Sequence, residues 1–403
     1  MEVRAGYKQT EVGVIPQEWK GTTIGEVVSF SGGSQPPRYT FRFTPTKDYI
    51  RLIQIRDYKS DDFESYIPDS LARKRCAADD IMIGRYGPPI FQILRGIDGA
   101  YNVALIKATP SGRIERDYLF YVLKQEKLFQ LIEALSRRSS GQTGVEMPAL
   151  KGYGLPLPPL PEQRAIATAL SDVDALLAAL DKLIAKKRDI KQAAMQQLLT
   201  GKQRLPGFSG KWEVKRLVDV VDFANGKPHE DHVDEKGSFY LITLDSIGID
   251  GKLKSEHRRT VLTDNSLVKN DIVIILSDIA HGNLLGLCDL IPEDNRYLLN
   301  QRVGRLRIKA ETKADPQYLR LQINRHQEHF KKRGQGTSQR HIYKRDIDQL
   351  EIKLPELLEQ TAIAAILSDM DADLTALEQH REKTRALKKG MMQVLLTGRI
   401  RLI

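Results

Sequence analysis

The chain has 403 residues, of which 41% are hydrophobic and 28% charged, a balance typical of proteins that bury sizeable cores. Lysine and arginine exceed aspartate and glutamate by 62 to 52, which favours a polyanionic partner. The presence of only Cys76 and Cys288 excludes a disulfide framework, and no apolar run reaches the roughly 18 residues that span a bilayer. The polar N-terminus shows no signal-peptide core, so we expect a soluble cytoplasmic protein without membrane contact.

Residues 1–155 predict a first α+β module. Short β-like runs at 49–55, 80–83 and 103–108 are separated by turn residues, and a helical stretch covers 116–135. Its polar loops carry residue types that hold phosphates and read base edges. These candidate DNA contacts are Arg38, Tyr39, Arg85, Tyr86, Arg137, Arg138, Gln142 and Thr143. For any one of them a solvated loop residue is the plainer interpretation, so the prediction concerns the loops as regions.

Residues 156–204 predict a long helix. Pro161 marks its start, no Pro or Gly occurs from Glu162 to Leu199, and Thr200-Gly201 is a stop signal. About 40 helical residues would be about 60 Å long. Apolar residues recur at a spacing of three and four, which favours a narrow coiled-coil seam over an ordinary bundle helix. The seam residues are Leu170, Val173, Leu177, Leu180, Ile184 and Leu198.

Residues 205–352 repeat the plan of the first module with different residues. Trp212 follows Leu205-Pro206 much as Trp19 follows Ile15-Pro16. Strand-like runs at 239–244, 271–274 and 303–308 and a helical stretch at 315–332 predict a second α+β module. Its candidate DNA contacts are Lys227, His229, Ser277, His281, Gln339 and Arg340.

Residues 353–403 repeat the helix. Residues 157–205 and 354–402 are identical at 27 of 49 positions without a gap, at an offset of 197. Lys187, Lys191, Arg381, Thr384 and Lys388 fall on the two seams, which predicts a polar middle or a register shift. We expect two globular domains joined by two long antiparallel coiled-coil helices, related as a pseudo-twofold internal repeat. The second seam consists of Leu367, Met370, Leu374, Leu377, Met391 and Leu395.

The motifs of nucleotide hydrolysis, zinc chemistry, nuclease and amino-methyltransferase activity are missing. Gly207 to Lys211 has the wrong spacing for a phosphate-binding loop, and Glu351-Ile352-Lys353 lacks the carboxylate partner that a nuclease site needs. The paired Asp172/Asp174 and Asp369/Asp371 fit a solvated or partner-facing helix surface. We therefore predict a protein that is not an enzyme and that holds no cofactor or metal.

The opening Gly6 to Pro16 with Trp19 resembles the start of type I restriction-modification specificity subunits. Leu157-Pro158-Pro159-Leu160-Pro161-Glu162-Gln163, followed by a helix ending at Thr200-Gly201, is similar to the central conserved region of that family, and 354–398 is similar to the distal one. The second copy departs from the pattern at Leu358 and Thr361 but keeps Glu359-Gln360.

This resemblance implies two target recognition domains, 1–155 and 205–352, each reading half of a split double-stranded DNA sequence. It implies that the helices of 156–204 and 353–403 set the spacer and dock two methyltransferase (M) subunits, and that restriction (R) subunits join the complex. The alternative is a coiled-coil scaffold or adaptor that does not read DNA. A fused restriction-modification enzyme would require the catalytic motifs that are missing.

Overall fold

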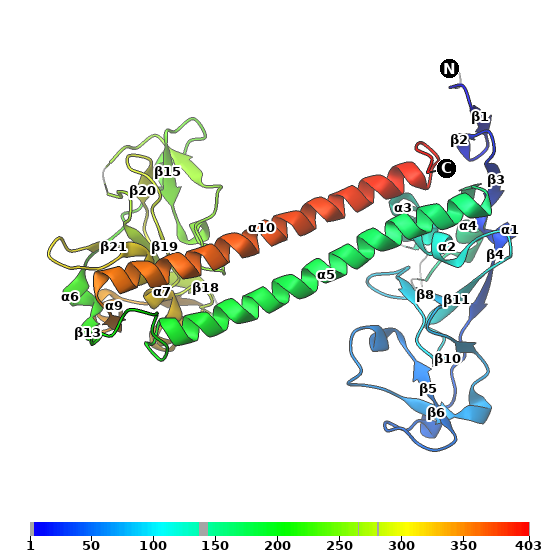
Figure 1. The fold of residues 1–403 in the computed structure, drawn as a ribbon, viewed down its shortest axis with the longest axis horizontal. Helices are drawn as coiled ribbons and strands as arrows, with labels where there is room; N and C mark the ends of the chain where they lie inside the picture. Colours follow the sequence, from blue (N-terminus) through cyan, green and yellow to red (C-terminus); the bar gives the residue numbers. More distant parts are fainter. Residues whose placement is uncertain (1–3, 137–143, 265, 280–281, 403) are drawn as a thin grey trace. The chain divides into compact units, whose positions relative to one another are not determined.

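The computed structural model describes residues 4–136, 144–264, 266–279 and 282–402. The chain divides into two compact units (Figure 1). Unit 1 combines Met1–Asp181 with Gln379–Ile403, and unit 2 is Lys182–Glu378. Each unit therefore contains one module together with parts of both long helices. The α+β class expected from the sequence is confirmed.

Unit 1 has two four-stranded sheets, with strand orders β4-β11-β8-β9 and β6-β5-β10-β7, and the two-stranded sheets β1-β2 and β12-β3 among its described residues. All pairs are antiparallel except β5 with β10. The strands are β1 (Tyr7–Thr10), β2 (Gly13–Pro16), β3 (Lys20–Thr23), β4 (Val28–Gly32), β5 (Tyr49–Ile53), β6 (Tyr66–Pro68), β7 (Arg75–Cys76), β8 (Ile81–Gly84), β9 (Ile93–Arg95), β10 (Gly99–Tyr101), β11 (Leu105–Pro110) and β12 (Gly154–Leu157). The helices of the module are α1 (Ile24–Val27), α2 (Arg116–Leu123), α3 (Glu126–Ser136) and α4 (Met147–Gly152).

Unit 2 repeats this topology. Its sheet β14-β21-β17-β19 corresponds to β4-β11-β8-β9, and β15 pairs in parallel with β20 as β5 does with β10. The strands are β13 (Glu213–Arg216), β14 (Val221–Asn225), β15 (Phe239–Ile242), β16 (Arg258–Thr260), β17 (Ile272–Ile275), β18 (Ser277–Ile279), β19 (Cys288–Leu290), β20 (Tyr297–Leu299), β21 (Val303–Ile308), β22 (Gln339–His341) and β23 (Glu351–Leu354). The helices of the module are α6 (Leu217–Val220), α7 (Pro316–Arg325), α8 (Gln327–Arg333) and α9 (Lys344–Asp348).

The helical stretches expected at 116–135 and 315–332 are each broken into two helices. The first break follows α2 at Lys124 and Gln125, and the second follows α7 at His326. Neither break contains Pro or Gly, so the sequence carries no signal for it.

The long helices α5 (Leu160–Leu198) and α10 (Leu357–Leu395) each have 39 residues, which corresponds to about 59 Å. Gly201 and Gly398 follow them with φ angles of 70° and 71°, the left-handed conformation that ends helices and favours glycine. A Cβ on Gly398 would lie 2.5 Å from the Pro16 side chain, so this position also needs glycine for lack of space.

The ends of the long helices belong to the cores of the modules. In unit 1, Ile166 and Leu170 of α5 and Leu395 of α10 are buried in the same cluster as Trp19 and Tyr118. In unit 2, Leu198 of α5 and Ile363 and Leu367 of α10 take the corresponding places. The two helices therefore pack together inside each unit, as the sequence predicts (Figure 1).

A buried carboxylate lies at the start of each long helix. Glu162 accepts hydrogen bonds from Trp19 Nε1 at 2.8 Å and from Arg401 Nε at 2.5 Å. We call these three residues the unit 1 clamp. Because an unpaired charge is costly to bury, both donors are needed to hold Glu162 in the core.

The same arrangement recurs in unit 2. Glu359 accepts from Trp212 Nε1 at 3.1 Å and from Arg204 Nε at 2.6 Å, and these residues form the unit 2 clamp. The residue after each glutamate repeats as well: Gln163 accepts from the backbone N–H of Glu115, and Gln360 from that of Asp315.

The seams are polar in the middle, as the lysines on them suggest. Lys388 donates to Asp174 at 2.5 Å in unit 1, and Lys191 donates to Asp371 at 2.6 Å in unit 2. Asp174, nearer the start of α5, pairs with Lys388, nearer the end of α10, and Lys191, later in α5, pairs with Asp371, earlier in α10. The two helices are therefore antiparallel. For Asp174 and Asp371 the interpretation as solvated or partner-facing residues is wrong, because both are partly buried and each bonds a lysine of the other long helix. Asp172 and Asp369 are exposed.

No helix among the described residues is long and apolar enough to cross a membrane.

We predict that Arg401→Ala lowers the free energy of unfolding of unit 1 by about 2–4 kcal/mol, because it leaves Glu162 buried with Trp19 as its remaining side-chain partner. Arg399→Ala is the matched control: Arg399 is exposed two residues away, and its loss should change stability by less than about 0.5 kcal/mol. Urea unfolding of the two variants checks this. Equal stability of both would show that the clamp contributes nothing.

Candidate nucleic-acid interface

The first-module candidates that the structure describes lie on two loops. Arg38 and Tyr39 form a short 3-10 turn between β4 and β5, and Tyr39 is 84% exposed. Arg85 and Tyr86 follow β8 and are partly buried, with the Arg85 guanidinium carbon 5.3 Å from the centre of the Tyr86 ring. The exposed turn is free to contact a ligand, whereas Arg85 and Tyr86 form a stacked pair at the end of a core strand.

The structure brings together two second-module segments that are far apart in sequence. Strand β18 pairs antiparallel with β22, which places Ser277 opposite His341 and Asp278 opposite Arg340. Gln339 lies opposite Ile279, whose side chain is 68% exposed. The candidates Ser277, Gln339 and Arg340 therefore belong to one two-stranded ribbon.

Two residues of this ribbon have structural roles. The buried Ser277 hydroxyl lies 2.6 Å from His341 Nδ1. The Arg340 guanidinium donates to the backbone carbonyls of Lys331 and Gly334 at 2.8 and 2.9 Å. These bonds occupy the Ser277 hydroxyl and part of the Arg340 guanidinium, which could otherwise bond a base. The Gln339 side chain makes no such bond with a described residue, so Gln339 is the most available of the three candidates.

Lys227 and His229 lie on a loop that is anchored at Asn300. The His229 N–H donates to Asn300 Oδ1 at 3.0 Å, and the Lys227 carbonyl accepts from the Gln301 N–H. A Cβ on Gly226 would lie 1.9 Å from the Asn300 carbonyl oxygen, so glycine is required for this close approach. The exposed Lys227 side chain is thus carried by a fixed backbone.

Glu230 adds a negative charge beside this loop. Hydrogen bonds from Gln301 and Asn300 lower the pKa of its carboxyl to about 2. The segment that carries Lys227 therefore also presents a fixed carboxylate, which suits a hydrogen-bonding surface better than a purely cationic one.

The candidates Arg137, Arg138, Gln142, Thr143 and His281 lie outside the described residues. No described residues cluster as three or more His, Cys, Asp or Glu side chains that could hold a metal ion.

Comparison with known proteins identifies the family. The model of the type I restriction modification DNA specificity domain matches residues 16–191 and again residues 209–386. The chain belongs to this family.

It contains two copies of the specificity domain, and its identification as a type I specificity subunit from the duplicated helix motifs is confirmed. A specificity subunit is the non-catalytic member of such a system. The chain is 28% identical to the Type I restriction enzyme MjaVIII specificity subunit of Methanocaldococcus jannaschii, over 96% of this chain and 94% of that protein.

Solved structures of the same kind share the fold. The S subunit of a type I restriction-modification system from M. genitalium matches with a TM-score of 0.62 at 15% identity, covering 98% of both chains. A chain from a structure of type I R-M complex assembly matches with a TM-score of 0.59 at 17% identity, covering 96% of this chain and 99% of that one.

All the predicted seam residues of α5 and α10 are buried or partly buried. Fully buried are Leu170, Leu180, Ile184, Leu198, Leu367, Leu374 and Leu395. Partly buried are Val173, Leu177, Met370, Leu377 and Met391.

Sequence reasoning missed two exposed aromatic residues of the first module. Phe43 and Phe63 are largely exposed, and the Arg56 guanidinium carbon lies 6.0 Å from the centre of the Phe63 ring. Exposed aromatic rings and arginines stack on bases. The alternation of arginine with aromatic residues in Arg38-Tyr39-Thr40-Phe41-Arg42-Phe43 is the signal that could have found Phe43.

We predict that unit 2 loses stability on mild acidification because of His326. Burial first, and then the charge of Arg325, lower the pKa of His326 to about 4. An unfolded histidine takes up its proton near pH 6.5. The unfolded state therefore binds more protons between pH 6.5 and 4, and the free energy of unfolding falls through that window, by about 1–2 kcal/mol after allowing for partial exposure.

Urea unfolding of the His326→Gln variant between pH 7 and 4.5 checks this. The variant should lose stability less steeply than the parent, with a residual slope from His257 and His329, whose pKa values burial also lowers. His232→Gln, at an exposed position of unit 2, is the control and should keep the parent slope. Identical slopes for the parent and His326→Gln would contradict the prediction.

Proposed function

We propose that the two modules, residues 1–155 and 205–352, are target recognition domains that each read one half of a bipartite double-stranded DNA sequence. The observation that carries this proposal is the contrast between the exposed loops and the frame, by which we mean the two long helices with their clamps and Asp–Lys pairs. The clamps and the Asp–Lys pairs recur residue for residue, whereas the exposed loops differ. Arg38 and Tyr39 occupy the loop after β4, and Lys227 and His229 occupy the loop after β14. A duplicated frame with two different reading surfaces fits an asymmetric split target.

The long helices, within residues 156–204 and 353–403, act in this proposal as the spacer. The length of an α-helix is fixed by its rise of 1.5 Å per residue, so 39 residues make a rigid element longer than one turn of B-DNA. The Asp–Lys pairs support this role because a polar pair in a seam specifies register.

The proposed partners are two methyltransferase subunits, which dock on the helices and modify the DNA, and restriction subunits that complete the complex. The structural match to a chain from a study of type I R-M complex assembly supports such an assembly. The alternative function, a scaffold that does not read DNA, predicts DNA binding that is absent or indifferent to sequence.

The first experiment is to co-express the chain with its methyltransferase subunit and map methylated adenines by long-read sequencing. Two short blocks around a fixed gap are expected. Exchange of residues 15–150 for the module of another family member should then change one block and leave the other intact. The replacement must keep a tryptophan at the position of Trp19, because unit 1 needs its clamp. A change in both blocks would overturn the proposal.

The helix length is tested by insertion. Seven residues inserted after Ile184 of α5 and seven after Leu377 of α10 lengthen both helices by about 10 Å and keep the heptad. The unread gap should grow by about three base pairs at 3.4 Å each. Insertion into α5 alone is the control. If Asp174 stays paired with Lys388, the insertion moves Lys191 about 10 Å along the helix away from Asp371, so the two Asp–Lys pairs cannot form together. We expect methylation to be lost. A lengthened pair with an unchanged gap would refute the spacer role.

A further inference from the structure

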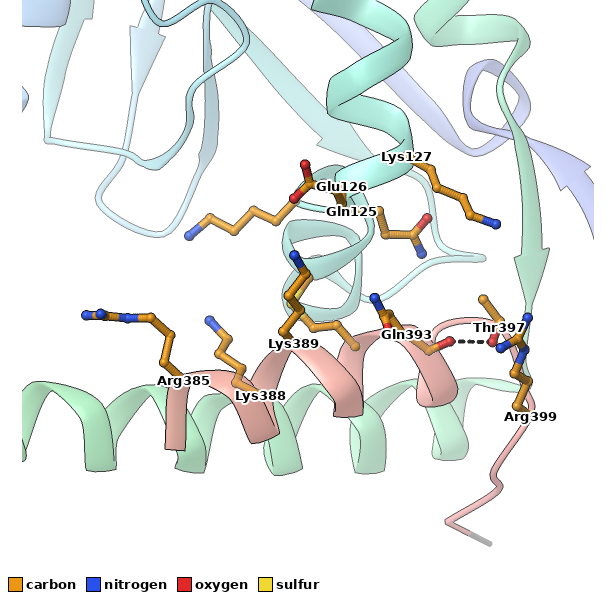
Figure 2. Close-up of a pocket in the computed structure, with 11 residues that line it drawn as sticks. Gln125, Glu126, Lys127, Arg385, Lys388, Lys389, Gln393, Thr397 and Arg399 are labelled. Carbon is orange, nitrogen blue, oxygen red and sulfur yellow. Dashed lines mark hydrogen bonds between the residues drawn. The ribbon is translucent and has the colours of Figure 1, made fainter. Parts of the chain in front are cut away.

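Unit 1 contains a cationic pocket of about 510 Å³ between the α2–α3 junction and the end of α10 (Figure 2). Six cations line it, and they come from two segments of the chain, 124–127 and 385–399. They are Lys124, Lys127, Arg385, Lys388, Lys389 and Arg399. Among the described residues that line it, Glu126 is the one carboxylate. The side chains of Lys388 and Lys389 point from α10 toward the α2–α3 segment (Figure 2).

Four of the six cations form no ion pair with a described residue. Lys388 is paired with Asp174, and Arg385 with Glu382. In the part of the chain that the structure describes, no carboxylate lies within ion-pair distance of the other four cations, Lys124, Lys127, Lys389 and Arg399. Lys124 instead places its ammonium 4.1 Å from the centre of the Phe120 ring. Its pKa is lowered, first by desolvation and second by the charge of Lys388.

Helix dipoles account for only part of this cluster. Cations stabilise the C-terminal end of a helix only within its last turn. Helix α10 ends at Leu395, so Lys388 and Lys389 lie more than one turn earlier. Lys124 is the C-cap of α2, where a cation is favourable, but Lys127 lies in the first turn of α3, where a cation is unfavourable.

Three of the six cations have no charged counterpart in unit 2, although the frame is duplicated. The offset of 197 replaces Lys389 by Gln192. The offset of 200, which aligns Glu115 with Asp315 and Tyr118 with Tyr318, replaces Lys124 by Asn324 and Lys127 by Gln327. Asn324 uses its side chain to bond the backbone of Cys288. The frame therefore does not require these three lysines.

The chemistry fits a phosphate better than a carboxylate. Several unpaired cations converge on one concave space, which suits a compact anion with several oxygens. A single carboxylate of an acidic protein segment would leave most of the four charges uncompensated. Gln125 and Gln393, which also line the pocket, can donate amide hydrogens to such oxygens.

We propose that this pocket binds a phosphate group, carried by the DNA backbone next to the first half-site or by a free nucleotide. The DNA source rests on the proposed function; the phosphate chemistry does not. As a backbone contact, the pocket anchors DNA without reading its sequence.

The test uses the complex of the chain with its methyltransferase subunits and the double variant Lys389→Gln with Arg399→Gln. Both residues are exposed, and their side chains make no hydrogen bond or ion pair with a described residue, so folding should be preserved. The charge-conserving variant Lys389→Arg with Arg399→Lys is the first control. Lys182→Gln with Lys186→Gln, which removes two charges from exposed positions on α5, is the second.

DNA affinity is measured by fluorescence anisotropy on a target duplex and a scrambled duplex across a salt series. For the DNA source we expect affinity to fall about tenfold on both duplexes at low salt, and the salt slope to fall by about one for each phosphate that the variant no longer binds. Both control variants should match the parent. For the nucleotide source, DNA affinity is unchanged, and calorimetry shows that ATP or pyrophosphate binds the parent but not the double variant.

Unchanged DNA affinity without binding of ATP or pyrophosphate would overturn the proposal. So would loss of methyltransferase subunits from the double variant alone, because this would make the pocket a docking site for an acidic protein surface. Failure of the proposed function has a different signature: the parent complex would bind target and scrambled duplexes equally well.

Discussion

The structure depends on a carboxylate buried where each long helix begins. Glu162 and Glu359 lie in module cores and are held by a tryptophan and an arginine that are distant in sequence. Because a buried charge is tolerated only when it is paired, the unit 1 clamp fixes three chain segments at one point, and the unit 2 clamp joins the start of α10 to the segment that holds Arg204 and Trp212. In unit 1 these segments are the head of the module, the start of α5 and the residues after α10. Unit 1 is therefore complete only when the last part of the chain has joined it.

The helix pairing follows the same logic. A seam of leucines alone would pack in several registers, because apolar contacts are not directional. The bonds Asp174–Lys388 and Lys191–Asp371 require one antiparallel register, and the repeat provides one such pair in each unit. Tyr121 links the first pair to its module by donating from its hydroxyl to Asp174 at 2.9 Å. The register of the helices is thereby coupled to the placement of α2.

The sequence predicts the elements well but not their partners. Strand runs, the two 39-residue helices and the duplicated plan follow from periodicity, turn residues and the 197-residue offset. The offset also repeats Arg204 as Arg401 and Lys191 as Lys388, so it could have marked these residues as structural. What they bond could not be deduced, because periodicity identifies a buried face and not what covers it. Ser277 and Arg340 illustrate this: both are polar loop-type residues by sequence, and both bond their own module.

The division between frame and loops explains how one chain can hold two different readers. The clamp residues, Gln163 or Gln360, and the Asp–Lys pairs are shared by both halves, and they hold the two long helices to each other and to the modules. The exposed residues of the loops, such as Tyr39 and Lys227, make none of these contacts. A loop can therefore change its side chains without disturbing the clamp beneath it. The unit 1 pocket follows the same principle, since Lys124, Lys127 and Lys389 lie at positions whose counterparts in the second half are uncharged.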